Sequence, residues 1–264
     1  MKKYFEVVII TFKAQIAYRF DVFIGVIVSF LRVILAYIMW SAIFLDKKEV
    51  GTFTLSMMIT YYIASSFLKR LDCSDSILWQ LSGEIREGQF TKYLLKPIEP
   101  IWYFVASSFS KTVFILGINL FAACICTLIF HNYFVLTVNL HLLFWGMGIN
   151  ILGLVFLVLF SYSIAILSLK FIDIGPLNMI RNNIVEFLTG TLIPLSLLPI
   201  WIQNAMKLFP FYYIYYLPVM LFIGRKEEEI PVALATLLFW NMLILFVDLK
   251  LYKGLIKSYE GVGI

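Results

Sequence analysis

The chain has 264 residues, of which 62% are hydrophobic and only 14% charged, and its mean hydropathy is +0.92. Soluble proteins average about 45–50% apolar residues, so the composition excludes an ordinary soluble domain and indicates an integral membrane protein. A membrane span needs about 20 apolar residues, so about six spans with short connections fill the chain. The net charge of +5 fits basic cytoplasmic loops better than nucleic-acid binding.

The N-terminal segment predicts a helix that lies in the membrane interface. Phe5, Val8, Ile9, Phe12 and Ile16 recur at helical spacing, and the charged residues lie off this stripe. The apolar run is too short for a secretory signal peptide, and no small-residue cleavage site follows it.

Apolar stretches of membrane-spanning type recur along the rest of the chain. We expect spans at 22–45, 53–68, 112–130, 140–169, from about 184 to the prolines 194 and 199, and 231–249. The apolar stretch 201–223 is broken by two prolines, so it predicts re-entrant half-helices on the external side, between spans five and six. The predicted fold is an all-α integral membrane protein with six transmembrane helices and a single domain over 1–264.

Basic residues fall mainly on alternate connections. With the N-terminus inside, the cytoplasmic segments carry Lys2, Lys3, Lys13, Arg19, Lys69, Arg70, Arg86, Lys92, Lys96, Lys170, Arg181, Lys250, Lys253 and Lys257. The external segments carry only Lys47, Lys48, Lys207, Arg225 and Lys226. The positive-inside rule therefore predicts that both termini and the insert between spans two and three are cytoplasmic.

This insert contains a charged run, GEIREGQFTKYLLKPIEP, at residues 83–100. An apolar stripe precedes and enters it, formed by Ile77, Leu78, Leu81 and Ile85. Gly88 stands where a helix C-terminus favours a residue with positive φ. The pattern predicts an amphipathic helix over 75–87, a second apolar patch at 93–95, and an insert that extends to about Ser110.

Two interpretations of this insert remain open. An amphipathic helix can rest on lipid headgroups, but such helices are usually rich in Lys and Arg, whereas this one contains Asp75, Glu84 and Glu87. We therefore favour a surface on which another protein docks.

Catalytic and nucleotide-binding motifs are absent from the sequence. It contains no GxxxxGK[ST] motif, and its two histidines, His131 and His141, have no nucleophile or carboxylate pair beside them. The cysteine spacing suits neither zinc nor a redox pair, so we predict no metal site and no enzyme. Gly146, Gly148 and Gly153 lie in an apolar span, where close helix packing is expected.

Polar residues inside spans have several possible roles. Arg32 shares a helix face with Ser29 and Ala36, and this face suits either a substrate path or dimer interface, while snorkelling of Arg32 to headgroups is the alternative. We interpret Lys111 as a snorkelling boundary residue. Interhelical hydrogen bonds are expected from Asn119, Asn150 and Asn241. An aromatic belt or an external gate is expected from Tyr212, Tyr213, Tyr215 and Tyr216.

Several runs resemble the permeases of bacterial ABC exporters of the type-two class, which are often encoded in pairs beside one ATPase. The runs are GQFTKYLLKPI at 88–98, FLTGTLIPLS at 187–196 with Leu198-Pro199, and the tail 250–264 with its YEGVG ending. Phe209-Pro210-Phe211 and Leu217-Pro218 continue the resemblance, which covers essentially the whole chain.

The resemblance implies roles for three segments. Residues 1–20 would be the interface helix, 72–100 the cytoplasmic segment with the coupling helix seated in an ATPase, and 201–223 the external re-entrant segment. Coupling is expected from Leu81, Glu84, Ile85, Arg86, Gly88, Tyr93, Leu95, Lys96 and Pro97. The external gate is expected from Pro194, Leu195, Pro199, Phe209, Pro210, Phe211 and Pro218.

The expected function follows from this resemblance. The chain is predicted to be the membrane subunit of an ATP-driven exporter in the bacterial plasma membrane, dimeric with itself or a sister permease. It is expected to contact membrane lipid and a cytoplasmic ABC ATPase dimer that binds ATP and magnesium, with no cofactor of its own. The substrate would be a hydrophobic or amphipathic drug, peptide or lipid. A secondary transporter or channel without an ATPase is the alternative, and a membrane protein that only sequesters a ligand is a third.

Overall fold

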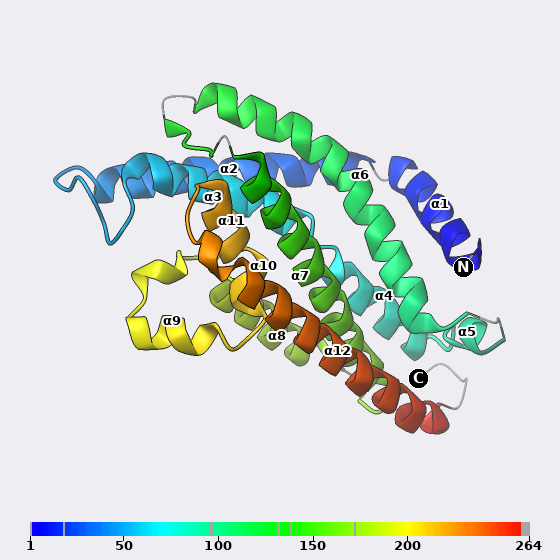
Figure 1. Ribbon diagram of the computed structural model, residues 1–264. Helices are drawn as coiled ribbons and strands as arrows, with labels where there is room; N and C mark the ends of the chain where they lie inside the picture. The colour runs from blue at the N-terminus through cyan, green and yellow to red at the C-terminus, as the bar shows by residue number, and fades with distance from the viewer. Residues whose placement is uncertain are drawn as a thin grey trace.

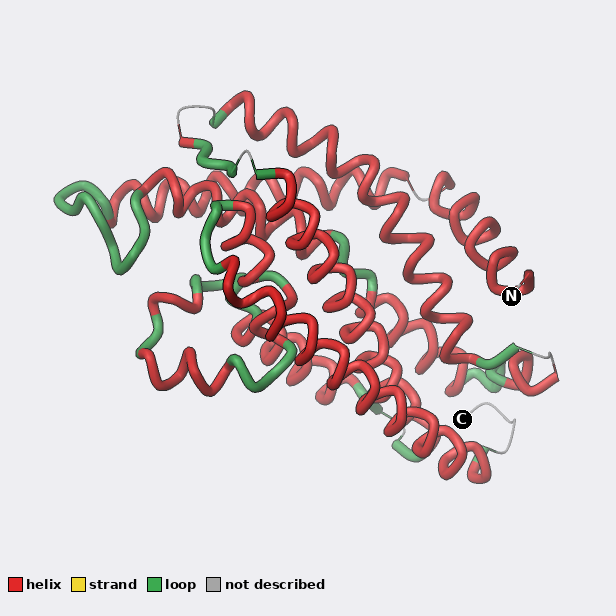
Figure 2. Tube along the Cα trace, viewed as in Figure 1, coloured by secondary structure: helices red, strands yellow, loops and turns green. Residues whose placement is uncertain are grey.

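The computed structural model describes residues 2–17, 19–95, 98–130, 133–137, 139–171 and 173–259. The regular structure of these residues is helical, and their β pairing is limited to the isolated bridge between Val50 and Phe53. Figure 2 shows helices along nearly the whole described chain, with short loops between most of them. The predicted all-α fold is confirmed for this part of the chain.

Helices follow one another in this order. The first half contains α1 (Lys2–Ala17), α2 (Arg19–Ile43), α3 (Leu55–Arg70), α4 (Ser74–Arg86), α5 (Thr91–Leu95) and α6 (Pro100–Ile129). The second half contains α7 (Leu140–Ile166), α8 (Gly175–Leu188), α9 (Ile200–Met206), α10 (Phe211–Ile214), α11 (Tyr216–Phe222) and α12 (Ile230–Leu255). Short 3-10 turns include Leu167–Leu169, Leu195–Leu197, Glu227–Glu229 and Ile256–Ser258.

Four of the described helices are long and apolar enough to cross a membrane, namely α2, α6, α7 and α12 with their short extensions. A fifth crossing results if α9 and the α10–α11 pair, which are bent by 85° relative to each other, count as one broken span. The other two predicted spans are too short for the length that a bilayer requires, about 20 residues, because α3 has 16 residues and α8 has 14.

Two predicted boundaries are wrong. The fifth span was expected to begin near Ile184, but α8 starts at Gly175 and ends at Leu188, just before Gly190 adopts a φ of +77° that terminates the helix. The insert was expected to continue to Ser110, but α6 already begins at Pro100. Proline is favoured in the first turn of a helix, where its missing N–H has no partner to lose.

Of the long helices, α6 and α12 pack on α7, while α2 packs on α3 and α6 (Figure 1). In the most apolar window of α7, 61% of the residues are buried, compared with 17–28% in the other three long helices. We call the end of the bundle with α4, α5 and the last turns of α12 the hairpin end. The opposite end, with the α2–α3 and α6–α7 connections, is called the loop end. Both ends are visible in Figure 1, the hairpin end to the right and the loop end to the left.

The N-terminal helix α1 lies along the first half of α6 (Figure 1). The Ser110 hydroxyl donates a hydrogen bond to the Val8 carbonyl over 2.7 Å, and the rings of Phe12 and Phe114 meet edge to face. Phe5 and Ile16, from the predicted apolar stripe, are exposed. This exposed stripe is the kind of surface that an interface helix presents to lipid, and its membrane position stays a prediction.

Small and amide side chains on the long helices make close contacts, as predicted. A Cβ at Gly153 would lie 3.0 Å from the backbone of Ile214, and one at Gly146 would crowd Phe222, whereas Gly148 faces open space. The expected interhelical hydrogen bonds of the three asparagines are present: Asn119 to the Phe67 carbonyl, Asn150 to the Ile214 carbonyl and Asn241 to the Leu152 carbonyl.

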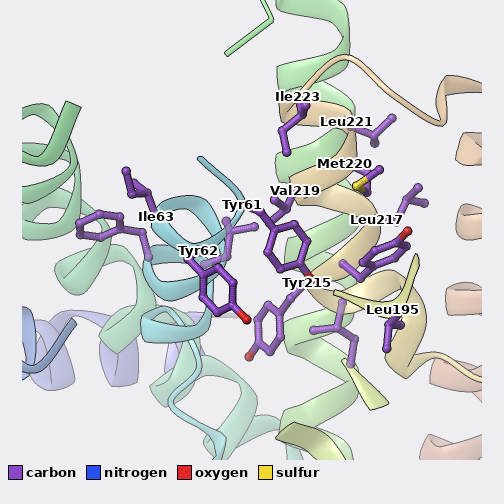
Figure 3. Close-up of a cluster of buried hydrophobic side chains, with 14 of the residues drawn as sticks. Tyr61, Tyr62, Ile63, Leu195, Tyr215, Leu217, Val219, Met220, Leu221 and Ile223 are labelled. Carbon is purple, nitrogen blue, oxygen red and sulfur yellow. The ribbon is translucent and has the colours of Figure 1, made fainter. Parts of the chain in front are cut away.

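The tyrosines of the α10–α11 segment lie in the interior. Tyr212, Tyr213, Tyr215 and Tyr216 are each at most 1% exposed, which excludes the expected aromatic belt on the surface of the chain. Figure 3 shows Tyr61 and Tyr62 of α3 close to Tyr215 and its neighbours in α11. The segment is buried because α7 presents glycines to it on one side and α3 presents these aromatic side chains on another.

Candidate functional site: the α4–α5 hairpin and its contacts

The predicted amphipathic helix of the insert is present as α4. It ends at Arg86, and Gly88 adopts the predicted positive φ, +73°. This turn lets the Phe90 N–H donate to the Glu84 carbonyl over 2.9 Å, which closes the helix and starts the return to α5. Helices α4 and α5 therefore form a tight hairpin.

The apolar face of α4 is covered by the chain itself. Leu81 and Ile85, both proposed as coupling residues, are buried with Ile77 and Leu78 in a cluster with side chains of α6 and α7, including Phe104 and Tyr162. These residues therefore fix the hairpin to the bundle, and the opposite face of α4 lies outside this cluster.

An ion pair joins the two arms of the hairpin. The Lys92 ammonium lies 2.7 Å from the Glu84 carboxylate, which also accepts a hydrogen bond from Gln80. Glu84 is only 9% exposed, and Tyr93, buried beside it, packs edge to face against Tyr103. Burial, together with the Glu84 charge, raises the pKa of Tyr93. Of the proposed coupling residues, Glu84 and Tyr93 thus make their described contacts within the hairpin and with α6.

The C-terminal end of the chain is attached to the hairpin turn. The Tyr259 hydroxyl donates to the Gly88 carbonyl over 2.8 Å, and the Thr91 N–H donates to the same hydroxyl over 3.2 Å. The rings of Tyr259 and Tyr252 both contact Phe90. In the sequence, Tyr259 belongs to the tail that carries the family resemblance, and no local pattern connects it with the hairpin.

The outward face of α4 is open. Trp79 is 45% exposed, and a side chain added at Gly83, one turn further along the same face, would meet nothing within 4 Å. On α5, Leu94 and Leu95 are 46% and 81% exposed. Lys96 and Pro97, which were also proposed to couple, lie outside the described residues. We call Trp79, Gly83, Leu94 and Leu95 the outer face of the hairpin.

A buried arginine ties the start of α4 to α8. Arg181 is 3% exposed and donates to the Ser74 hydroxyl, and its guanidinium lies 4.0 Å from the carboxylates of both Asp72 and Asp75. The sequence analysis treated Arg181 only as a cytoplasmic charge. Helical spacing was the available signal, because Asn178, Arg181 and Val185 share one face of α8 and are all buried.

The turn between α3 and α4 also holds a shielded thiol. Cys73 is buried between the two helices, and this burial raises the pKa of its thiol to about 11. Asp72 adds to the shift, while nearby Lys111 and Arg70 oppose it. The thiol is therefore protonated at neutral pH.

Helix α7 connects the hairpin with the proposed gate. Phe211, at the start of α10, packs against Phe156 and Phe160 of α7, and Phe209 lies against Trp240 of α12. Leu195 is buried, and the loop that contains it is held by Tyr61 and Tyr62, which donate to the carbonyls of Gly190 and Leu192 over 2.7 Å each.

The prolines of the proposed gate begin short elements. Pro194 precedes a 3-10 turn, Pro199 precedes α9 and Pro210 precedes α10, while Pro218 lies buried inside α11. Pro194, Pro199 and Pro210 occupy the N-cap positions of these elements, where the ring fixes φ between −53° and −66°. The gate residues therefore gather in one bent segment, α9–α11 with the loop before it.

The three residues of α2 that were proposed for a path or dimer interface differ in their exposure. Ser29 and Ala36 are buried against the bundle, and the Ser29 hydroxyl donates to the Gly25 carbonyl. The side chain of Arg32 is exposed and lies close enough to Lys69 to affect its electrostatic environment. Lys69 itself forms an ion pair with Glu186 of α8. Arg32 therefore lies at the edge between α2 and the α3–α8 pair.

The matched family agrees with this architecture. Residues 30–263 match the family described as ABC-2 family transporter protein. This range includes both helices of the hairpin and all the long helices apart from the first part of α2. No curated protein matches the chain. With helices that can cross a membrane and a family match over most of its length, the chain belongs to the ABC-2 transporter family and is a multi-pass membrane component of a transporter.

Proposed function

We propose that the chain is the transmembrane subunit of an ATP-driven exporter and that the outer face of the hairpin docks on a cytoplasmic ABC ATPase. The observation that carries this proposal is the division of α4 into two faces. Its apolar face is covered by α6 and α7, while Trp79 stays exposed on the opposite face. Exposed tryptophan side chains are frequent anchors of protein interfaces.

The contacts inside the bundle provide a route for movement. A displacement of α4 would act directly on α7, because the buried face of α4 packs against the second half of α7. Helix α7 in turn contacts α10 closely at Gly153 and α11 at Gly146. Closure of the ATPase dimer would in this way shift the bent α9–α11 segment, which we propose as the external gate.

Membrane orientation follows from the charges. The hairpin end would face the cytoplasm of a bacterial cell, with both chain ends on that side and α9–α11 toward the outside. Helices α3 and α8 would complete six crossings together with neighbouring residues. ATP and magnesium would bind in the ATPase alone.

A second copy or a sister permease would cover α2 and α8. Exposed apolar side chains run along both helices, among them Ile27 and Leu35 of α2 and Met179 and Ile180 of α8. Arg32 is exposed on α2 beside them, and a charge at this depth costs at least about 2.5–3.5 kcal/mol in lipid, which favours a protein or water-filled surrounding. A hydrophobic or amphipathic drug, peptide or lipid would pass along this surface.

One observation favours a secondary transporter as the second candidate. Asp248 of α12 is fully buried and pairs with the Ser163 hydroxyl of α7, and its other oxygen has no described partner. Buried carboxyl groups inside membranes often bind protons or ions in transport. In that case Asp248→Asn would abolish uptake driven by a proton gradient in proteoliposomes without any ATPase.

Co-purification tests the proposed docking. A native ATPase subunit should purify with the full-length chain, and Trp79→Ala combined with Leu95→Ala should release it. Trp201 and Leu208, which are 73% and 70% exposed near α9, provide the matched control, and their double alanine variant should retain the ATPase. Retention of the ATPase by the hairpin variant, or transport without an ATPase, contradicts the proposal.

A further inference from the structure

A polar recess lies at the junction of α1, α2, α3, α6 and the first turn of α4. Its volume is about 310 Å³, and its polar walls come from Gln15, Arg70, Asp72, Ser76 and Lys111. The proposed transport cycle assigns no role to this recess.

Two cations in the recess have no acidic partner among the described side chains. Arg70 donates to the Val22 carbonyl over 2.5 Å, and its Nε is buried without a partner. Lys111 donates to the Ser76 hydroxyl over 3.1 Å. The ion pairs between described residues include neither cation. Half-buried cations of this kind are stabilised when an anion with several acceptor oxygens binds between them.

The only described acid that lines the recess is already engaged. One oxygen of Asp72 accepts a hydrogen bond from the Ser74 N–H over 2.8 Å, and the other lies 4.0 Å from the buried guanidinium of Arg181. Because Arg181 balances the charge of Asp72, the recess keeps the positive charge of Arg70 and Lys111.

The backbone of α2 makes space for the arginine. A Cβ at Gly25 would overlap the guanidinium of Arg70, so only glycine at this position allows the side chain to lie across α2. The fixed guanidinium of Arg70 and the point charge of Lys111 thus approach one space from two helices. Arginine in particular binds phosphate oxygens in a bidentate manner.

The position of the recess favours a lipid as the source of the phosphate. It lies where α2 begins and α3 ends, which in the proposed orientation is the depth of the cytoplasmic headgroups. Beside it, Phe23, Ile24 and Ile27 of α2 are exposed and offer an apolar surface for acyl chains. Basic pockets between helices on the cytoplasmic side are known to bind anionic headgroups.

We propose that Arg70 and Lys111 bind the phosphate of an anionic membrane lipid in this recess. The lipid would link α2, α3 and α6 at the point where the hairpin segment leaves the bundle. This inference rests on the recess and on the proposed membrane orientation, and it holds whether or not the hairpin docks an ATPase.

Native mass spectrometry of the purified full-length chain tests the proposal. We expect one phosphatidylglycerol to stay bound under conditions that remove phosphatidylcholine, whose phosphate is compensated by a choline cation. Arg70→Gln with Lys111→Gln should weaken phosphatidylglycerol binding at least about tenfold, because each basic residue contributes substantially to attraction of anionic lipid. Lys13→Gln with Lys253→Gln removes two exposed charges that do not line the recess. This control variant should bind phosphatidylglycerol as strongly as the unchanged chain does.

Two further variants separate binding from folding. Arg70→Lys with Lys111→Arg keeps both charges and should retain the lipid. Gly25→Ala leaves the charge unchanged but displaces the Arg70 guanidinium, and should weaken retention as well. Equal binding of the two lipids, or full retention by the double glutamine variant, overturns the proposal. Displacement of the lipid by millimolar inorganic phosphate overturns the assignment to a lipid and leaves a site for free phosphate.

Discussion

The Tyr259 hydroxyl donates a hydrogen bond to the Gly88 carbonyl over 2.8 Å, so residues far apart in sequence close the hairpin together. Gly88 forms the turn between α4 and α5, and Tyr259 follows the last turn of α12. The hairpin is therefore held by α7 at its apolar face and by the C-terminal segment at its tip.

Removal of this hydroxyl should loosen the tip. For Tyr259→Phe we expect faster amide hydrogen exchange over residues 88–95, with a loss of about 1 kcal/mol for each hydrogen bond that disappears. Tyr252→Phe is the matched control, because the Tyr252 ring also contacts Phe90. The control should exchange at the unchanged rate, and equal protection in both variants would show that the hydroxyl does not hold the hairpin.

The contact of α7 with α10 can be tested with two glycines of one helix. Gly153→Leu should lower the thermal unfolding temperature, since a Cβ there lies 3.0 Å from Ile214 and overpacking costs about 1–3 kcal/mol. Gly148→Leu should leave the temperature unchanged or raise it, because this position is open and leucine favours a helix over glycine. Equal shifts in the two variants would contradict the proposed contact.

The effects of substitutions at Arg181 and Asp72 on stability should be coupled, because the two side chains lie close together. Arg181→Met leaves Asp72 without its partner and should destabilise the chain by about 3 kcal/mol. Adding Asp72→Asn should restore part of this loss, which a double-mutant cycle measures as a coupling energy. Arg225→Met, at an arginine that donates to the Thr52 carbonyl at the loop end, is the control and should show no coupling with Asp72. Strict additivity of Arg181→Met and Asp72→Asn would rule out the link between α8 and α4.

Labelling of Cys73 should depend strongly on pH. With a pKa of about 11, its thiolate fraction rises about tenfold per pH unit up to pH 10, whereas an ordinary cysteine approaches its plateau near pH 9. Maleimide labelling of the chain with Cys124→Ser and Cys126→Ser measures this rate, and the denatured chain provides the ordinary reference. The raised pKa also means that the thiol stabilises the fold below pH 8.5 and loses this contribution as pH rises toward 11. A plateau near pH 9 in the folded chain would contradict the burial of Cys73.

The sequence predicted where helices form better than it predicted which residues pack against them. The stripe from Ile77 to Ile85 and the glycine at position 88 defined α4 and its end, because periodicity and backbone conformation are local properties. That the stripe packs on α6 and α7 could not be read from the pattern, since an apolar face looks the same whatever covers it. The contacts of Glu84 and Tyr93 within the hairpin could not be read from the pattern either, and their role in coupling stays a prediction.

The errors in the second half have a similar cause. Arg181 was predicted to lie in a cytoplasmic segment before a span that begins near Ile184, but it belongs to α8. Its partners, Ser74 and Asp72, lie more than a hundred positions earlier in the sequence, so only the fold brings them together. The tyrosines at positions 212, 213, 215 and 216 were expected in an aromatic belt or an external gate, and the belt is excluded because contacts with α7 and α3 bury them.

Cross-linking at the outer face of the hairpin tests the central claim most directly. In a chain without its native cysteines, Gly83→Cys should form a cross-link with the ATPase subunit of the purified complex, and ATP should change its yield. The matched variant Leu208→Cys, at an exposed position near α9, should form none. A cross-link of equal yield at both positions, or none at Gly83→Cys in a complex that transports, would contradict the account.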